Sequence, residues 1–277
     1  MKISEILEKI KAYHPPVNEE RTTDVIKYGN PDQECSGVVV TCFASCDVIR
    51  SAAAAGANLI IVHEPLFWKH EDTSDWCADM KLYQEKAALL EKYGMVVFRD
   101  HDRIHASPKV EDREFMDGIF EGICKELGWE NYVINYPNKP LVYEFPEAKD
   151  GEELGKELIQ KIGLKGIRIV GDRHTKVKKV YLCEHLGNMD RSIDQKIRAC
   201  EFEQYDAIIP LEMIDWTLPA YIRDSCQMGV PKIMYNIGHF NLEELGMRYM
   251  AKWLPDVIEK EVPVTYIQSG DSFDFLI

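Results

Sequence analysis

The feature that most constrains this chain is an alternation of short β-branched runs with helical patterns, which occurs twice along the sequence. In α/β folds each such helix returns the chain so that the next strand lies parallel to the last. Both series follow the order β-α-β-α-β, and matching strands are offset by about 140 residues. We therefore predict an α/β fold made of two similar halves with mostly parallel strands.

The elements of the two series can be placed by residue number. The expected strands are 37–42, 59–62, 95–98, 179–183, 207–209 and 232–235. The expected helices are 46–55, 78–93, 190–202, 218–228 and 241–254. Gly56, Gly94 and Gly229 follow three of these helices, where a left-handed cap residue is common.

A different segment separates the two series. It is expected to contain helices at 112–127 and 152–162, extended pieces at 132–134 and 141–145, and a strand at 167–170. Pro137, Pro140 and Pro146 interrupt it, which favours a domain boundary between Gly128 and Asp150. We expect a first α/β half at 1–128, and the connecting segment with the second half at 129–277.

Length and composition exclude several classes of protein. The chain has 277 residues, of which 45% are apolar and 29% charged, so one large or two smaller domains can bury a sufficient core. No uncharged run exceeds about a dozen residues, whereas a membrane-spanning helix needs roughly 20. The N-terminus alternates charge and bulk at helical spacing, unlike a secretory signal. These patterns predict a cytoplasmic protein that does not enter a membrane.

Net charge and cysteine content disfavour two further classes of protein. A formal net charge of −14 repels phosphate backbones and disfavours nucleic acid as a partner. Eight cysteines without an export signal indicate reduced thiols. The spacing of Cys42 and Cys46 fits neither paired zinc knuckles nor a C-x-x-C redox motif, so packed thiols are favoured over a redox protein.

Histidines gather where the predicted strands end, which is the edge at which parallel α/β sheets bind ligands. Five of the eight histidines fall there: His63, His101, His105, His185 and His239. Glu243 follows His239 by four residues, and Asn241 is expected to cap the helix between them. Any one of these histidines could be an ordinary hydrogen-bonded loop residue. As a group with carboxylates they favour a Zn, Mn, Fe or Co site between the halves.

Three of these strand ends carry a family resemblance. His63-Glu64-Pro65-Leu66-Phe67, residues 101–105 and Gly238-His239-Phe240-Asn241-Leu242-Glu243 resemble, in that order, the three signatures of the Nif-three-like family (NGG-one interacting factor three). Members of that family carry a dinuclear metal centre and form toroidal homohexamers. The resemblance extends from about Thr23 to the C-terminus. It implies two divalent ions, a homo-oligomer and these metal ligands: His63, Glu64, His101, His105, His239 and Glu243.

Departures from the family pattern change what is expected of the site. Glu64 stands where the family has a second histidine, and His105 stands where it has an aspartate. A bridge between two metals would fall to Glu64 or Glu243, because a neutral imidazole does not readily bridge. Glu184 and His185 stand where the family tends to have a glycine-rich turn. Glu212 stands at a position that is often acidic in the family. These three residues are expected to be catalytic or, alternatively, part of a solvated loop.

The function that these features predict is metal-dependent hydrolysis of a small, anionic or carbonyl-bearing molecule, of cyclohydrolase or amidohydrolase type. Family annotation includes a cyclohydrolase acting on GTP, but neither GxGxxG nor GxxxxGK[ST] occurs in this sequence. The alternative is a metal-binding scaffold that performs no chemistry, so whether the protein is an enzyme stays open at this point.

Overall fold

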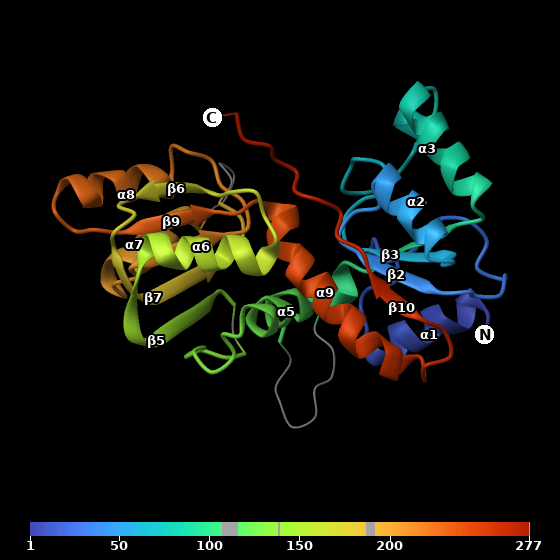
Figure 1. The fold of residues 1–277 in the computed structure, drawn as a ribbon, viewed down its shortest axis with the longest axis horizontal. Coiled ribbons are helices and arrows are strands. Elements are labelled where there is room, and N and C mark those ends of the chain that lie inside the picture. The colour runs from blue at the N-terminus through green and yellow to red at the C-terminus, as the bar shows by residue number, and fades with distance from the viewer. Residues whose placement is uncertain (107–115, 138, 187–191, 277) are drawn as a thin grey trace. The chain divides into compact units, whose positions relative to one another are not determined.

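The structure, a computed structural model, describes residues 1–106, 116–137, 139–186 and 192–276. Contacts divide the chain into two compact units. The first unit comprises Met1–Ile123 and Glu244–Gly270, and the second comprises Cys124–Glu243 and Asp271–Ile277. Each unit is built around its own five-stranded sheet (Figure 1).

The first unit has the strand order β1-β4-β3-β2-β10. Its strands are β1 (Ile26–Tyr28), β2 (Val38–Thr41), β3 (Leu59–Val62), β4 (Val96–Arg99) and β10 (Val264–Tyr266). Neighbouring strands are parallel except for β1, which is antiparallel to β4. The three central strands are buried at every position, as expected for strands covered on both faces.

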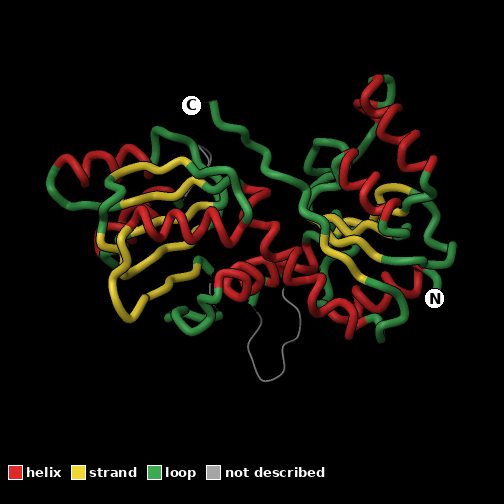
Figure 2. Tube along the Cα trace, viewed as in Figure 1, coloured by secondary structure: helices red, strands yellow, loops and turns green. Residues whose placement is uncertain are grey.

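Helices cover this sheet (Figure 2). They are α1 (Ile3–Tyr13), α2 (Cys46–Ala54), α3 (Lys81–Lys92) and the short α4 (Asp102–His105), with a 3₁₀ turn, η1, at Asp75–Cys77. Val48, Ile49 and Ala52 of α2 pack with Val39 and Ile60 in one apolar cluster. The hydroxyl of Ser45 accepts a hydrogen bond from the amide of Val48, which caps the start of α2.

The second unit has the strand order β5-β7-β8-β9-β6. Its strands are β5 (Leu141–Asp150), β6 (Arg168–Gly171), β7 (Lys176–Cys183), β8 (Ala207–Pro210) and β9 (Ile233–Asn236). Strands β7, β8 and β9 are parallel, whereas the outer strands β5 and β6 are antiparallel to their neighbours. The helices are α6 (Gly151–Ile162), α7 (Ile193–Phe202) and α8 (Leu218–Gln227).

Two further helices contain residues of both units: α5 (Gly118–Leu127) and α9 (His239–Val257). The expected mixed α/β fold with two α/β halves is confirmed by the two five-stranded sheets. Gly56, Gly94 and Gly229 have φ of 75°, 61° and 85°, as expected after three helices. Among the described residues, no helix is both long and apolar enough to cross a membrane.

Several local predictions were wrong. Asn241 does not cap α9, because the helix already begins at His239. The predicted helix over 78–93 begins at Lys81, after η1. The first residues of the helices expected at 112–127 and 190–202 lie outside the described residues. Strands β1 and β10, three residues each, were not predicted, since so short a run carries no clear period.

The C-terminal segment also differs from the expected order of two consecutive halves. Residues 244–270 pack with the first unit, where Val264, Thr265 and Tyr266 of β10 pair in parallel with β2. The chain therefore leaves the first unit near Ile123 and returns to it at Glu244.

Helices α5 and α9 come into close contact within the first unit. A Cβ added to Gly246 would lie 2.7 Å from the Cα of Ile119, and one added to Gly122 would lie 2.5 Å from the Cα of Gly246. Backbone atoms cannot move aside as a flexible side chain can. Glycine at both positions therefore sets the distance between the two helices.

We predict that Gly246→Ala lowers the free energy of unfolding by about 1–3 kcal/mol, because it overpacks this contact. The control is Gly37→Ala, whose added Cβ would meet its nearest atoms at 3.4 Å; we expect it to change stability by less than about 1 kcal/mol. Urea unfolding of both variants measures the difference, and equal stabilities would contradict the prediction.

Candidate metal-binding site

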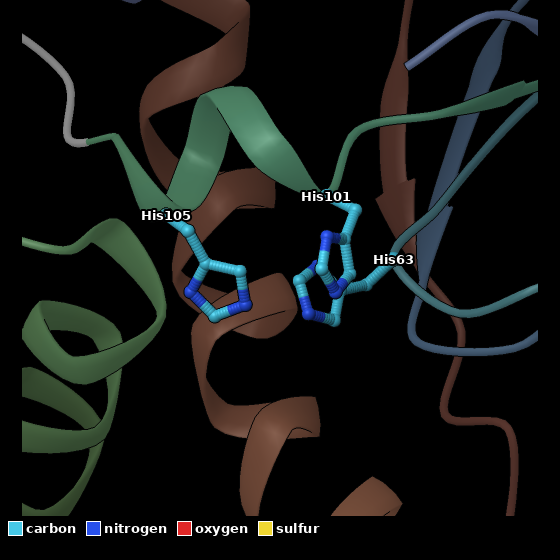
Figure 3. A group of neighbouring side chains, drawn as sticks. All are labelled: His63, His101 and His105. Carbon is cyan, nitrogen blue, oxygen red and sulfur yellow. The ribbon is translucent and has the colours of Figure 1, made fainter. Parts of the chain in front are cut away.

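Three histidines of the first unit meet at the carboxyl ends of β3 and β4. His63 directly follows β3, and His101 and His105 lie on the segment after β4 (Figure 3). Their ring centroids are 4.7 Å apart for His63 and His101, and 4.9 Å for each of the other two pairs. One ring nitrogen from each lies within 4.8 Å of the others. This spacing allows all three imidazoles to reach one metal ion.

Each of these imidazoles directs its Nδ1 at an oxygen atom. The distances are 3.1 Å from His63 to the carbonyl of Asp100, 2.8 Å from His101 to Oδ1 of Asp102, and 2.7 Å from His105 to Oδ2 of Asp117. A carbonyl or carboxylate oxygen only accepts, so Nδ1 carries the proton in each neutral ring. The lone pair is then on Nε2, the nitrogen available to a metal.

The Asp102 carboxylate is held in its ionised form. Burial opposes ionisation, but hydrogen bonds from His101, Thr23 and Thr22 keep the pKa of Asp102 below its ordinary value. Its Oδ2 accepts from the hydroxyl of Thr22 at 2.8 Å and from the amide of Thr23 at 2.9 Å. The acceptor that orients His101 is therefore itself fixed in place.

Asp24 fixes the backbone of the segment that carries His101. Its buried carboxylate accepts hydrogen bonds from the amides of His101, Asp102 and Arg103, at 2.8, 2.8 and 2.7 Å. These three bonds cap the start of α4, which is too short to be stable alone. The ring positions thus depend on a buried side chain from a distant part of the sequence.

Burial, together with the neighbouring His63 and His105, lowers the pKa of His101 to about 3. Near neutral pH the His101 ring is therefore uncharged, which is the form that binds metals. No proton therefore has to leave the ring before it can bind a cation.

Glu64, the other expected ligand in the first unit, lies beside a buried guanidinium. Its Oε2 is 3.8 Å from Nη2 of Arg99, and Nε of Arg99 donates to the carbonyl of His63 at 2.8 Å. Arg99 is the last residue of β4, and it is buried like the rest of that strand. The guanidinium of Arg99 thus places a positive charge beside the side chain of Glu64, next to His63.

The second unit gathers a different set at the ends of β7, β8 and β9. Nδ1 of His185 lies 3.0 Å from Oε1 of Glu212, and Nδ1 of His239 lies 3.3 Å from Oε2 of the same carboxylate. Nε2 of His239 lies 3.0 Å from Oε1 of Glu243. His239 and Glu243 are four residues apart on α9 and share one face of it, although the helix begins earlier than predicted.

Two residues singled out in the sequence make contacts outside the candidate metal clusters. Glu184 lies next to His185 in sequence but pairs with Lys139 at 3.1 Å. The side-chain amide of Asn241 (Nδ2) donates to the carbonyl of Ile237 at 2.9 Å and to the carboxylate of Asp271 at 3.0 Å. Neither belongs to the clusters of possible metal ligands found among the described residues.

The acceptors behind the ligand histidines were not predicted. Asp102 adjoins His101, so its role could have been suspected from sequence. Asp117 is twelve residues from His105 and also accepts from the amides of Ile119 and Phe120 at the start of α5. No local pattern points to it, because the contact forms only once the chain has folded.

The chain has recognisable relatives. The family model for Duf34/NIF3 (NGG1p interacting factor 3) matches residues 1–271. No curated protein sequence gives a significant match.

Solved structures share the fold at low identity. Staphylococcus aureus hypothetical protein SA1388 is 14% identical with a TM-score of 0.69, covering 100% of this chain and 99% of that one. A Bacillus cereus protein related to NIF3 is 15% identical with a TM-score of 0.68 and the same coverage. HcgD from Methanocaldococcus jannaschii is 17% identical with a TM-score of 0.63, covering 99% and 98%.

We predict that Asp117→Asn weakens binding of a divalent metal by about 10–100-fold, because the amide would present a donor to Nδ1 of His105 and favour the wrong tautomer. The asparagine oxygen can still cap α5, so the fold should persist. Asp47→Asn, at an exposed ion pair with Arg50, is the control. Competition against a chromophoric chelator measures both affinities, and equal values would refute the role of Asp117.

We also predict a pH dependence for the metal-free protein. The folded pKa of His101, about 3, lies below its ordinary value of 6.5, so between these values the unfolded chain binds the proton and the folded protein does not. Stability should therefore fall as pH drops below 6.5. The metal-free proteins are prepared with a chelator. The thermal midpoint should decrease less from pH 7.5 to pH 5 for His101→Gln than for the unaltered protein. An identical fall in both would be evidence against this prediction.

Proposed function

The chain belongs to the Duf34/NIF3 family, and from that premise we propose that it is a metal-dependent hydrolase with a dinuclear centre. Its substrate would be a small, anionic or carbonyl-bearing molecule. The observation that carries this proposal is the cluster of three imidazoles, each with Nδ1 directed at an oxygen acceptor. Such outer acceptors accompany metal-ligating histidines.

The proposal assigns His63, His101 and His105 to one ion, with Glu64 beside them. It assigns His239 and Glu243, in the second unit, to the other ion on the strength of the family resemblance. Imidazole and carboxylate ligands suit Zn, Fe, Mn or Co. Two divalent ions when bound would activate water near neutral pH and polarise the bond that is attacked.

The charge around the three histidines bears on the substrate. Three neutral imidazoles leave the charge of a divalent ion uncompensated. Glu64 is already close to the buried guanidinium of Arg99, which offsets its negative charge. These groups would attract and orient an anion or a carbonyl oxygen in a protein whose net charge is −14.

Asp102 and Asp117 would act by holding the rings, since each touches a ligand histidine rather than the space in front of it. Glu184, His185 and Glu212 are proposed to contact substrate or transfer protons from the loops that follow β7 and β8. By resemblance we further propose a cytoplasmic homo-oligomer, with a hexamer as the expected form.

The test is a measurement of metal content followed by a substrate screen. We predict that the purified protein contains divalent metal and hydrolyses a member of a panel of phosphoesters, nucleotides and cyclic amides. His105→Ala should lose more than the ~10–100-fold in metal affinity that outer-shell changes cost, with a matching loss of turnover. Exposed His174→Ala serves as the control.

Two outcomes would count against the proposal. Hydrolysis that survives complete chelation of the metal would contradict metal dependence. Bound metal without turnover on the whole panel would favour the alternative, a metal-binding scaffold that performs no chemistry.

A further inference from the structure

The C-terminal segment, residues 271–276, packs with the second unit. The carboxylate of Asp271 fixes its start. Oδ1 of Asp271 accepts hydrogen bonds from Nδ2 of Asn241 and from the amide of Phe273, both at 3.0 Å. Its Oδ2 accepts from the amide of Lys165 at 3.4 Å. Two separate parts of the second unit therefore hold this segment.

Two glycines leave room for the aromatic rings of the segment. A Cβ added to Gly166 would lie 3.2 Å from ring carbons of Phe275, and one added to Gly238 would lie 2.9 Å from Cε2 of Phe273. Gly238 also has a φ of 102°, which residues with a side chain rarely adopt. Both rings are thus packed on backbone that a side chain would crowd.

A cavity of about 260 Å³ opens beside these rings. Arg168 at the start of β6 and Asn236 at the end of β9, which are paired across the sheet, form one part of its wall. Phe273, Asp274 and Phe275 of the C-terminal segment form another part. The cavity therefore lies at the carboxyl end of β9, the edge at which parallel α/β sheets bind ligands.

The charges in the cavity wall favour an anion. Asp274 pairs with Nζ of Lys165 at 3.1 Å, which offsets its negative charge. Arg168 is exposed, and its guanidinium forms no ion pair or hydrogen bond with any residue that the structure describes. A guanidinium presents a planar fork of N–H donors that matches a carboxylate or a phosphate. The uncompensated charge of the wall is therefore positive.

A second cavity, of about 170 Å³, connects this place with a candidate metal ligand. Its wall includes His239, Ser272 and Phe273. Phe273 lines both cavities, and its side chain is 52% exposed. A molecule in contact with Arg168 and Phe273 would therefore lie close to His239.

We propose that the larger cavity binds a small planar anion, an aromatic or heteroaromatic ring that carries a carboxylate or a phosphate. Arg168 pairs with the anionic group, and Phe273 and Phe275 contact the ring. At about 260 Å³ the cavity is smaller than most ligand pockets, which limits the size of the ring system. Identifying this molecule as the substrate rests on the proposed function, whereas the binding site stands without it.

The test uses the full chain, both as purified and after removal of metal with a chelator, so that binding to a metal ion is distinguished. Calorimetric titration with benzoate and with phenyl phosphate should show binding of at least one probe in both preparations. Arg168→Gln should weaken that binding by about 10–100-fold, because a charge-assisted hydrogen bond is lost. Phe273→Ala should weaken it by about 2–10-fold.

Two variants and two probes serve as controls. Arg173→Gln removes another exposed arginine, which pairs with Glu152, and Phe202→Ala removes an exposed phenylalanine of α7. Both should bind the probes as the unaltered protein does. Benzyl alcohol, which lacks the charge, and inorganic phosphate, which lacks the ring, should bind more weakly than the matching probe.

The inference is overturned if neither probe binds, or if Arg168→Gln binds them as tightly as the unaltered protein. Inorganic phosphate that binds as tightly as phenyl phosphate would overturn the role of the rings. Probe binding that depends on Arg168, in a protein that hydrolyses nothing on the substrate panel, would leave this site standing while the proposed function fails. Metal-dependent hydrolysis without probe binding would give the opposite result.

Discussion

The site depends on one requirement of imidazole chemistry: a histidine can bind a metal only through a nitrogen that carries no proton. In the first unit this requirement is met three times by an oxygen at Nδ1, from the backbone of Asp100 and from the side chains of Asp102 and Asp117. The fold supplies these oxygens from different elements. Without them, the rings would be free to adopt either tautomer and to turn away from a shared point.

The sheets explain how residues so far apart in sequence meet. Parallel strands that are buried on both faces end at one edge, and the residue that follows each strand is the first to be released from the packed core. His63 directly follows β3 in the first unit, and His101 and His185 are the second residues after β4 and β7. The five carboxylate bonds of Asp24 and Asp102 to backbone amides and to Thr22 then hold the segment after β4.

Sequence alone predicted the parts that depend on local pattern. The buried strands β2, β3 and β4 are mostly apolar runs, and His63 and His101 lie at the ends of β3 and β4, so these strands and their candidate ligands could be predicted together. The pairing of His239 with Glu243 followed from helical spacing, although the start of α9 did not. The return of 244–270 to the first unit and the contact of Asp117 with His105 could not be predicted, since both arise from tertiary packing.

The central claim is that three imidazoles present Nε2 to one divalent ion while Nδ1 of each donates to oxygen. A crystal structure of the metal-loaded protein, with anomalous data collected at the edge of the bound metal, tests it most directly. The account predicts an anomalous peak about 2.0–2.1 Å from Nε2 of His63, His101 and His105, with the three Nδ1 contacts preserved. A peak bonded to Nδ1 of any of the three, or no peak at this cluster in metal-loaded crystals, would contradict it.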